Sequence, residues 1–145
     1  MQDEQRLVQS LPHAIVRLFR LINRAHNRAL KPHGLSAEQA HVLSVLWIYG
    51  AMTMGKLQRH LALSSPTLTG AIDRMEAQKL VHRVPNPDDG RAWLLEPEPA
   101  ANRKRKKIDD TLEATDDACF ATLTVAERRE LGRLLDKCIA GLEAG

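Results

Sequence analysis

The most constraining feature of the sequence is a β-hairpin signal inside a chain whose other segments are typical of helices. Two β-prone runs, VHRV at 81–84 and RAWLL at 91–95, flank the turn sequence PNPDDG. Within it, Asp89-Gly90 is a strong signal for a tight hairpin turn. The prolines of the following EPEP cannot donate hydrogen bonds, so they do not continue a central strand.

Helical periodicity covers most of the remaining chain. Apolar residues at steps of three and four predict a long first helix over 7–30, and Phe19 and Leu21 form a second stripe that indicates cover by another subunit. Long helices are also predicted over 100–121 and from about 125 to the C-terminus. Capping residues mark the start of four helices, at Ser36, Thr53, Ser65 and Thr124.

Composition restricts the class of protein. The 145 residues suit one domain, and 3% aromatic residues leave a core of aliphatic side chains. A net charge of +3 is compatible with an anionic partner. No signal peptide or membrane span is indicated, so a cytoplasmic protein is expected. Cys119 and Cys138 are expected to be two buried thiols, with no cofactor or metal site.

The order of these elements defines the fold class. Two short helices in tandem, followed directly by a hairpin, form a winged helix-turn-helix. The prediction is a mainly α protein, 1–145, with a winged-helix lobe over 36–99. Long helices over 5–31 and 100–143 flank that lobe and supply apolar surface far from the hairpin.

Residues 64–95 resemble the signature of the MarR family of bacterial transcriptional regulators. The matching positions are Thr67, Thr69, Asp73, Arg74, Leu80, Arg83, Asp89 and Arg91. The resemblance implies a homodimer held by the first and last helices. Each subunit would place a recognition helix in the major groove of a palindromic operator and Arg91 in the flanking minor groove. A small ligand or an oxidant commonly weakens DNA binding in this family.

The sequence departs from the family pattern at three places. Lys79 stands where glycine usually ends the recognition helix, so a left-handed cap there would be strained. Gly70 replaces a larger polar or basic residue. LEPEP after the second wing strand leaves the junction to the next helix undetermined.

Several side chains are candidates for DNA contact. Hydroxyl groups at the start of the recognition helix suit contact with phosphates or base edges; they belong to Ser64, Ser65, Thr67 and Thr69. Ser64 and Ser65 also suit N-capping of the helix. Arg74 either contacts DNA, remains solvated, or pairs with Asp73 or Glu76.

The wing tip supplies the clearest DNA-binding candidate. Arg91 suits the negative potential of a narrow minor groove, and Asp89 can orient its guanidinium through a bidentate pair.

Further charged residues surround that surface. Asp73 would repel phosphates and is expected to pair with Arg83 or Arg74. The short helix before the recognition helix carries three candidates for contact with the DNA backbone: Lys56, Arg59 and His60. The basic run 103–107 is expected to be a solvated helix start, with non-specific DNA contact as the alternative.

The family resemblance implies a ligand pocket that lies between the dimerisation helices and the lobe. Its candidate residues are Arg20, Arg24, His41 and Trp47. An aromatic or phenolic anion held by arginine and histidine is the effector suggested by the family. A metal bound by His26, His33 and His41 is disfavoured, as is thiol sensing by the two cysteines.

The sequence favours one function over two others. The leading one is a sequence-specific DNA-binding transcriptional regulator, a ligand-responsive repressor that binds as a homodimer. The alternative is a winged-helix protein-interaction module with only non-specific DNA affinity. An enzyme is not predicted, because no motif pairs a nucleophile with a base and no glycine-rich phosphate loop is present.

Overall fold

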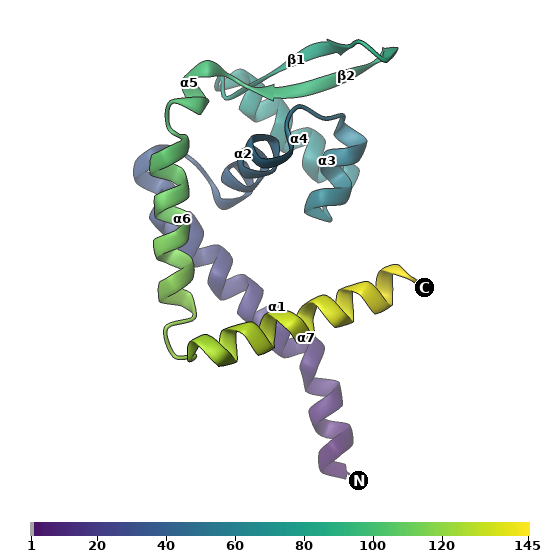
Figure 1. The fold of residues 1–145 in the computed structure, drawn as a ribbon, viewed down its shortest axis with the longest axis vertical. Helices are drawn as coiled ribbons and strands as arrows, with labels where there is room; N and C mark the ends of the chain where they lie inside the picture. Colours follow the sequence, from purple (N-terminus) through teal and green to yellow (C-terminus); the bar gives the residue numbers. More distant parts are fainter. Residues whose placement is uncertain (1) are drawn as a thin grey trace.

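A computed structural model describes residues 2–145, without the side chains of residues 7–9. The elements follow the predicted order (Figure 1): α1 Gln2–Leu30, η1 Lys31–His33, α2 Ala37–Tyr49, α3 Met54–Leu61, α4 Ser65–Ala77, β1 Val81–Asn86, β2 Asp89–Pro97, α5 Pro99–Asn102, α6 Arg105–Cys119 and α7 Val125–Glu143. The predicted fold class, mainly helical with one antiparallel hairpin, is confirmed. No helix of the described residues is long and apolar enough to cross a membrane.

Most of the helices that follow α1 begin at or next to the capping residues that the sequence predicted. Ser36 and Gln39 form a reciprocal capping box at the start of α2, and Thr124 and Glu127 form another at α7. The Thr53 side chain caps α3. The cap of α4 is Ser64 rather than the predicted Ser65, a shift of one residue.

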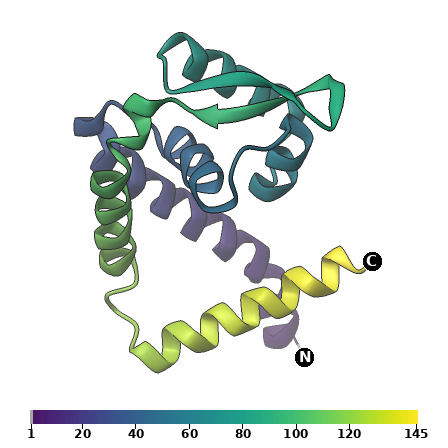
Figure 2. The same cartoon turned by 45° about the horizontal axis from the view of Figure 1, so that its top comes forward.

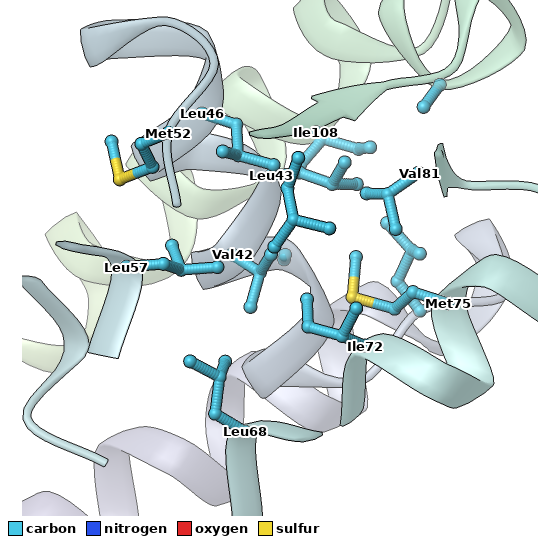
Figure 3. Packing of buried hydrophobic residues seen from close by; sticks show 14 of the residues in the cluster. Val42, Leu43, Leu46, Met52, Leu57, Leu68, Ile72, Met75, Val81 and Ile108 are labelled. Carbon is cyan, nitrogen blue, oxygen red and sulfur yellow. The ribbon is translucent and has the colours of Figure 1, made fainter. Parts of the chain in front are cut away.

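The core lies inside the winged-helix region. Side chains from α2, α3, α4 and the hairpin converge there (Figure 3), and Ile108 of α6 joins them. They are fully or almost fully buried, and include Val42, Leu43, Leu46, Met52, Leu57, Leu68, Ile72, Met75, Val81 and Leu95. Aliphatic packing of this kind matches the low aromatic content.

The hairpin differs from its prediction at the turn. Asn86 pairs with Asp89, so Pro87 and Asp88 form the two-residue turn and Gly90 lies in β2. The φ angle of Gly90 is not positive, so the tight turn expected at Asp89-Gly90 is not formed. The prediction failed because the Asn86 side chain supplies the turn chemistry, by accepting a hydrogen bond from the Asp88 amide at 3.0 Å.

Two prolines with different roles form the junction between the wing and α5. β2 continues to Pro97, which pairs with Val81, and Pro99 occupies the first turn of α5. There the missing N–H leaves no helical hydrogen bond unmade.

The predicted helix over 100–121 is interrupted at 103–104, between α5 and α6. Like charges three and four residues apart in the basic run 103–107 destabilise a continuous helix. The Trp47 indole also holds the end of α5, by donating to Asn102 Oδ1 at 2.8 Å.

The outer helices extend away from this core. α1 packs along α6 and meets α2, whereas α7 turns at the end of α6 and none of its residues is buried (Figures 1 and 2). The expectation of two buried thiols is wrong, because Cys119 is half-buried and Cys138 is exposed. Both lie on the α6–α7 arm, where the chain provides little cover.

Lys79 gives the first testable prediction. Its φ is +58°, and the Leu80 amide donates to Met75 O at 2.9 Å, so the end of α4 has the left-handed cap that glycine favours. Lys79→Gly should raise the free energy of unfolding by about 1 kcal/mol, because it removes the Cβ strain. Chemical denaturation measures the change.

Lys79→Ala is the matched control, because it removes the charge and keeps the Cβ. An equal gain in this variant would show that charge, and not backbone strain, is relieved.

Candidate nucleic-acid interface and the adjoining cavity

The recognition helix candidate α4 presents two chemically different faces. Leu68, Ile72 and Met75 are buried in the core. The opposite face is open, and every predicted DNA-contacting residue of α4 and the wing is exposed: Ser64, Ser65, Thr67, Thr69, Arg74, Asp89 and Arg91. The helix is therefore fixed by its apolar face and free to bind with its polar one.

The hydroxyls at the start of α4 are not equivalent. Ser64 Oγ accepts from the Thr67 amide at 3.4 Å and donates to Thr67 Oγ1 at 2.7 Å. Ser65 and Thr69 make no side-chain hydrogen bond within residues 2–145. Capping thus occupies Ser64, while Ser65 and Thr69 keep their hydroxyls available to an external partner.

An arginine clamp joins the wing to the recognition helix. Arg83 of β1 donates to Glu76 at 2.9 Å and to Asp73 at 3.4 Å. Of the two partners predicted for Asp73, Arg83 is therefore the one found. The single positive charge of Arg83 offsets part of the negative charge of these two carboxylates, which would otherwise repel phosphate more strongly.

Arg74 has a partner that the sequence did not indicate. Its guanidinium lies 4.0 Å from Glu38 of α2, and its side chain is 67% exposed. A contact this long and this solvated is weak. Arg74 can therefore exchange Glu38 for a phosphate at little cost.

The wing tip holds Arg91 outside the regular ladder. Pro85 pairs with Trp93 and Asn86 with Asp89, so residues 90–92 have no partner in β1. The expected bidentate pair with Asp89 is not found, because Asp89 Oδ1 instead accepts from the Arg91 backbone amide at 3.0 Å. That amide is the nearer donor across the turn. Asp89 shapes the tip, and the guanidinium has no partner in the part of the chain that the structure describes.

Basic residues continue on α3. Lys56 and Arg59 face the wing turn across a shallow hollow, and Lys56, Arg59 and His60 line a second hollow beside it. The run 103–107 is exposed as predicted, with ion pairs from Arg105 to Asp109 and from Lys106 to Asp110.

A cavity of about 600 Å³ adjoins the interface between α1 and the lobe. Its lining residues are Phe19, Asn23, Asn27, Ser36, Glu38, Gln39, His41, Leu61, Leu63 and Arg74. Only His41 among the four predicted pocket residues belongs to it. Arg20 and Arg24 do not line it, and Trp47 lies instead against Asn102 and Arg105.

The cavity residues missed by the sequence analysis did carry a signal. Phe19, Asn23 and Asn27 are spaced four apart on α1, so they share one face. Amides that follow an apolar residue on one face of an amphipathic helix indicate a polar contact, and Asn27 indeed accepts from the Ala37 amide at 2.7 Å.

Three ionisable groups meet behind the cavity. His26 of α1 is buried, and its ring lies between Asp116 of α6 at 2.7 Å and His41 of α2 at 3.2 Å. Burial lowers the pKa of His41, the neighbouring His26 lowers it further, and Asp116 acts in the opposite direction. His33 is separate from them and lies 3.1 Å from Thr111 Oγ1.

Comparison with known proteins relates the winged-helix lobe to one family. Residues 35–93 match the model of the MarR family. This part of the chain is therefore similar to the MarR family. The proteins of that family are winged-helix, DNA-binding transcriptional regulators.

Relatives extend the similarity over the flanking helices. The transcriptional regulator MgrA of Staphylococcus aureus is 27% identical over 140 residues, which cover 96% of this chain and 94% of MgrA. A cysteine-to-serine variant of E. coli MarR, solved with operator DNA, has a TM-score of 0.83 at 24% identity, over 90% of this chain and 94% of that one.

A third relative is BpsR of Bordetella bronchiseptica, whose DNA binding is regulated by 6-hydroxynicotinic acid. It has a TM-score of 0.81 at 25% identity, over 88% of this chain and 91% of BpsR. The MarR fold is therefore shared by the winged-helix region and the outer helices.

The cap of α4 yields the second prediction. Ser64→Ala should lower the free energy of unfolding by about 1 kcal/mol, because the Thr67 amide loses its acceptor. Ser65→Ala is the matched control and should change it by less than about 0.5 kcal/mol. Equal losses in the two variants would contradict the assignment of Ser64 as the cap.

Proposed function

We propose that this chain is a regulator of the MarR family, which represses transcription by binding a palindromic operator as a homodimer and releases it when a small effector binds. Residues 36–99 form the DNA-binding lobe, and 5–31 and 100–143 the dimerisation helices. The observation that carries the proposal is the exposed polar face of α4 beside a free arginine at the wing tip. This is the arrangement that reads a major groove and its neighbouring minor groove together.

Each candidate residue has a distinct role in the proposed complex. The hydroxyls of Ser65, Thr67 and Thr69 face phosphates and base edges, while Ser64 fixes the start of the helix. Arg74 leaves Glu38 for the DNA backbone. Arg91 enters the minor groove, and Asp89 sets the backbone from which it projects.

The outer helices support a dimer. Large apolar side chains of α1 and α7 are exposed in the single chain, among them Leu11, Ile15, Phe19, Leu21, Leu134, Ile139 and Leu142. An apolar surface of this extent marks an interaction site. Because these helices lie away from the wing, two copies can join there and leave both recognition helices outward (Figure 2).

The cavity between α1 and α4 is the proposed effector site. Its guanidinium, imidazole and amide groups suit an aromatic carboxylate or phenolate, and Phe19, Leu61 and Leu63 supply apolar contact. An anion there competes with DNA for Arg74. The regulation of BpsR by an aromatic acid supports the same class of effector.

Selection of bound sequences from a random pool of duplex DNA tests the function. A palindrome should be recovered, because a symmetric dimer binds two identical half-sites. Thr69→Ala should change the base preference within each half-site. Weak recovery without a shared sequence would contradict the proposal and favour the protein-interaction module.

The wing arginine provides a quantitative prediction. Arg91→Ala should weaken binding of the selected DNA by about 1–3 kcal/mol, because a minor-groove cation is lost. Fluorescence anisotropy at fixed ionic strength measures it. Arg129→Ala on α7 is the control, and an unchanged affinity of the Arg91 variant would refute the wing contact.

A further inference from the structure

His26, His41 and Asp116 join three elements of the fold, α1, α2 and α6. His26 is 7% exposed, and the two histidine rings meet edge to face with centroids 5.3 Å apart. One His26 nitrogen, Nε2, bonds Asp116, and the other, Nδ1, lies 3.2 Å from His41 Nε2. α1, α2 and α6 are thus linked by one chain of hydrogen bonds.

The number of protons on the pair decides whether this chain exists. With no added proton, His26 donates to Asp116 and His41 donates to His26. With one added proton, His26 donates through both nitrogens and His41 accepts. With two, both facing nitrogens carry hydrogen, so the 3.2 Å contact has two donors and no acceptor.

We propose that His26, His41 and Asp116 form a proton-controlled latch that holds α2 against α1 and α6 and opens when the histidine pair takes up its second proton. The latch connects the outer helices to the first helix of the winged-helix lobe. Opening it changes how the lobe sits on those helices. In the proposed dimer, that position sets the spacing between the two recognition helices.

The charges around His41 determine the direction of the response. It faces His26 from α1, Glu38 from its own helix, Arg74 from α4 and Asp116 from α6, while α3 contributes the apolar Leu61 to the same cavity. Glu38 and Asp116 favour a charged imidazole, but each already has a cationic or donor partner. Burial and His26 oppose it and lower the pKa of His41.

The sign of the pH dependence follows. A histidine with a lowered pKa binds fewer protons in the latched state than in the open one, where its pKa is near the usual 6.5. The latched state therefore loses stability as the pH falls through about 6.5. Since the functional consequence rests on the proposed DNA binding, operator affinity should fall on acidification.

Another histidine of the lobe lies outside this cluster. His82 Nδ1 of β1 is 3.2 Å from Glu98 Oε1, at the junction between the wing and α5. The His82→Gln variant serves as the matched control.

The first experiment measures affinity for the selected DNA between pH 7.5 and 5.5 at constant ionic strength. The unmodified protein should lose about tenfold in affinity, because the latched state binds fewer protons than the open one. His41→Gln should lose less than about threefold, because its amide donates to His26 but cannot be protonated. His82→Gln should follow the unmodified protein, and an equal fall in His41→Gln would overturn the latch.

The second experiment needs no DNA. NMR titration of the imidazole nitrogens of the unmodified protein should show His41 taking up its proton below the usual range. In His26→Gln, His41 should titrate closer to the usual value. Titration of His41 that is unaffected by this substitution would overturn the proposal. Failure to bind any selected DNA at pH 7.5 would instead refute the proposed function, and the titration would still decide the latch.

Discussion

Burial of most of α2, up to its exposed end at Ile48 and Tyr49, is the constraint around which the structure is arranged. Ala40, Val42, Leu43 and Leu46 are almost completely inaccessible, and the helix contacts α1, α3, α4 and β2. A helix that is apolar around its circumference cannot lie on a surface, so other elements must enclose it. The recognition helix and wing take their positions from that enclosure.

The polar contacts between α2 and elements outside α3, α4 and the wing consequently have a disproportionate role. Asn27 bonds its first turn, His26 its middle, and Asn102 the Trp47 indole near its end. All three partners belong to the outer helices or α5. Apolar packing allows small sliding movements, whereas these directional bonds specify one position of the lobe. The outer helices can therefore change the position of the lobe most directly by forming or breaking these hydrogen bonds.

Sequence reasoning succeeded where a local interaction fixes the structure. The boxes at Ser36 and Thr124 and the buried stripe of α4 were predictable because the partners lie three or four residues apart. The left-handed strain at Lys79 was likewise anticipated from the helix exit. The turn was misplaced because Asn86 and Asp89-Gly90 compete locally, and only pairing of the whole hairpin selects between them.

The candidate site was predictable in part for the same reason. Exposure of the α4 hydroxyls and Arg91 follows from helix and hairpin periodicity. The other contacts of the site join residues that are far apart in the sequence. Arg74 pairs with Glu38, 36 positions away, and His26 bonds Asp116, 90 positions away. The cavity lining likewise combines residues of several elements. Such contacts depend on the angle between packed helices, which periodicity does not specify.

The wing combines a fixed base with an arginine side chain at its tip that can adjust its position. Leu95 of β2 bonds Met52 as well as pairing with Arg83, so the base of the wing is tied to the lobe on two sides. The tip is released from the ladder at 90–92, where Asp89 restrains the backbone of Arg91 but not its guanidinium. A fixed base places the arginine near one groove, and its free side chain adjusts to the groove width that varies with DNA sequence. Pairing Asp89 with the guanidinium would give a more ordered arginine, yet DNA would then have to break that pair before binding it. The observed arrangement therefore limits the cost of ordering to one side chain.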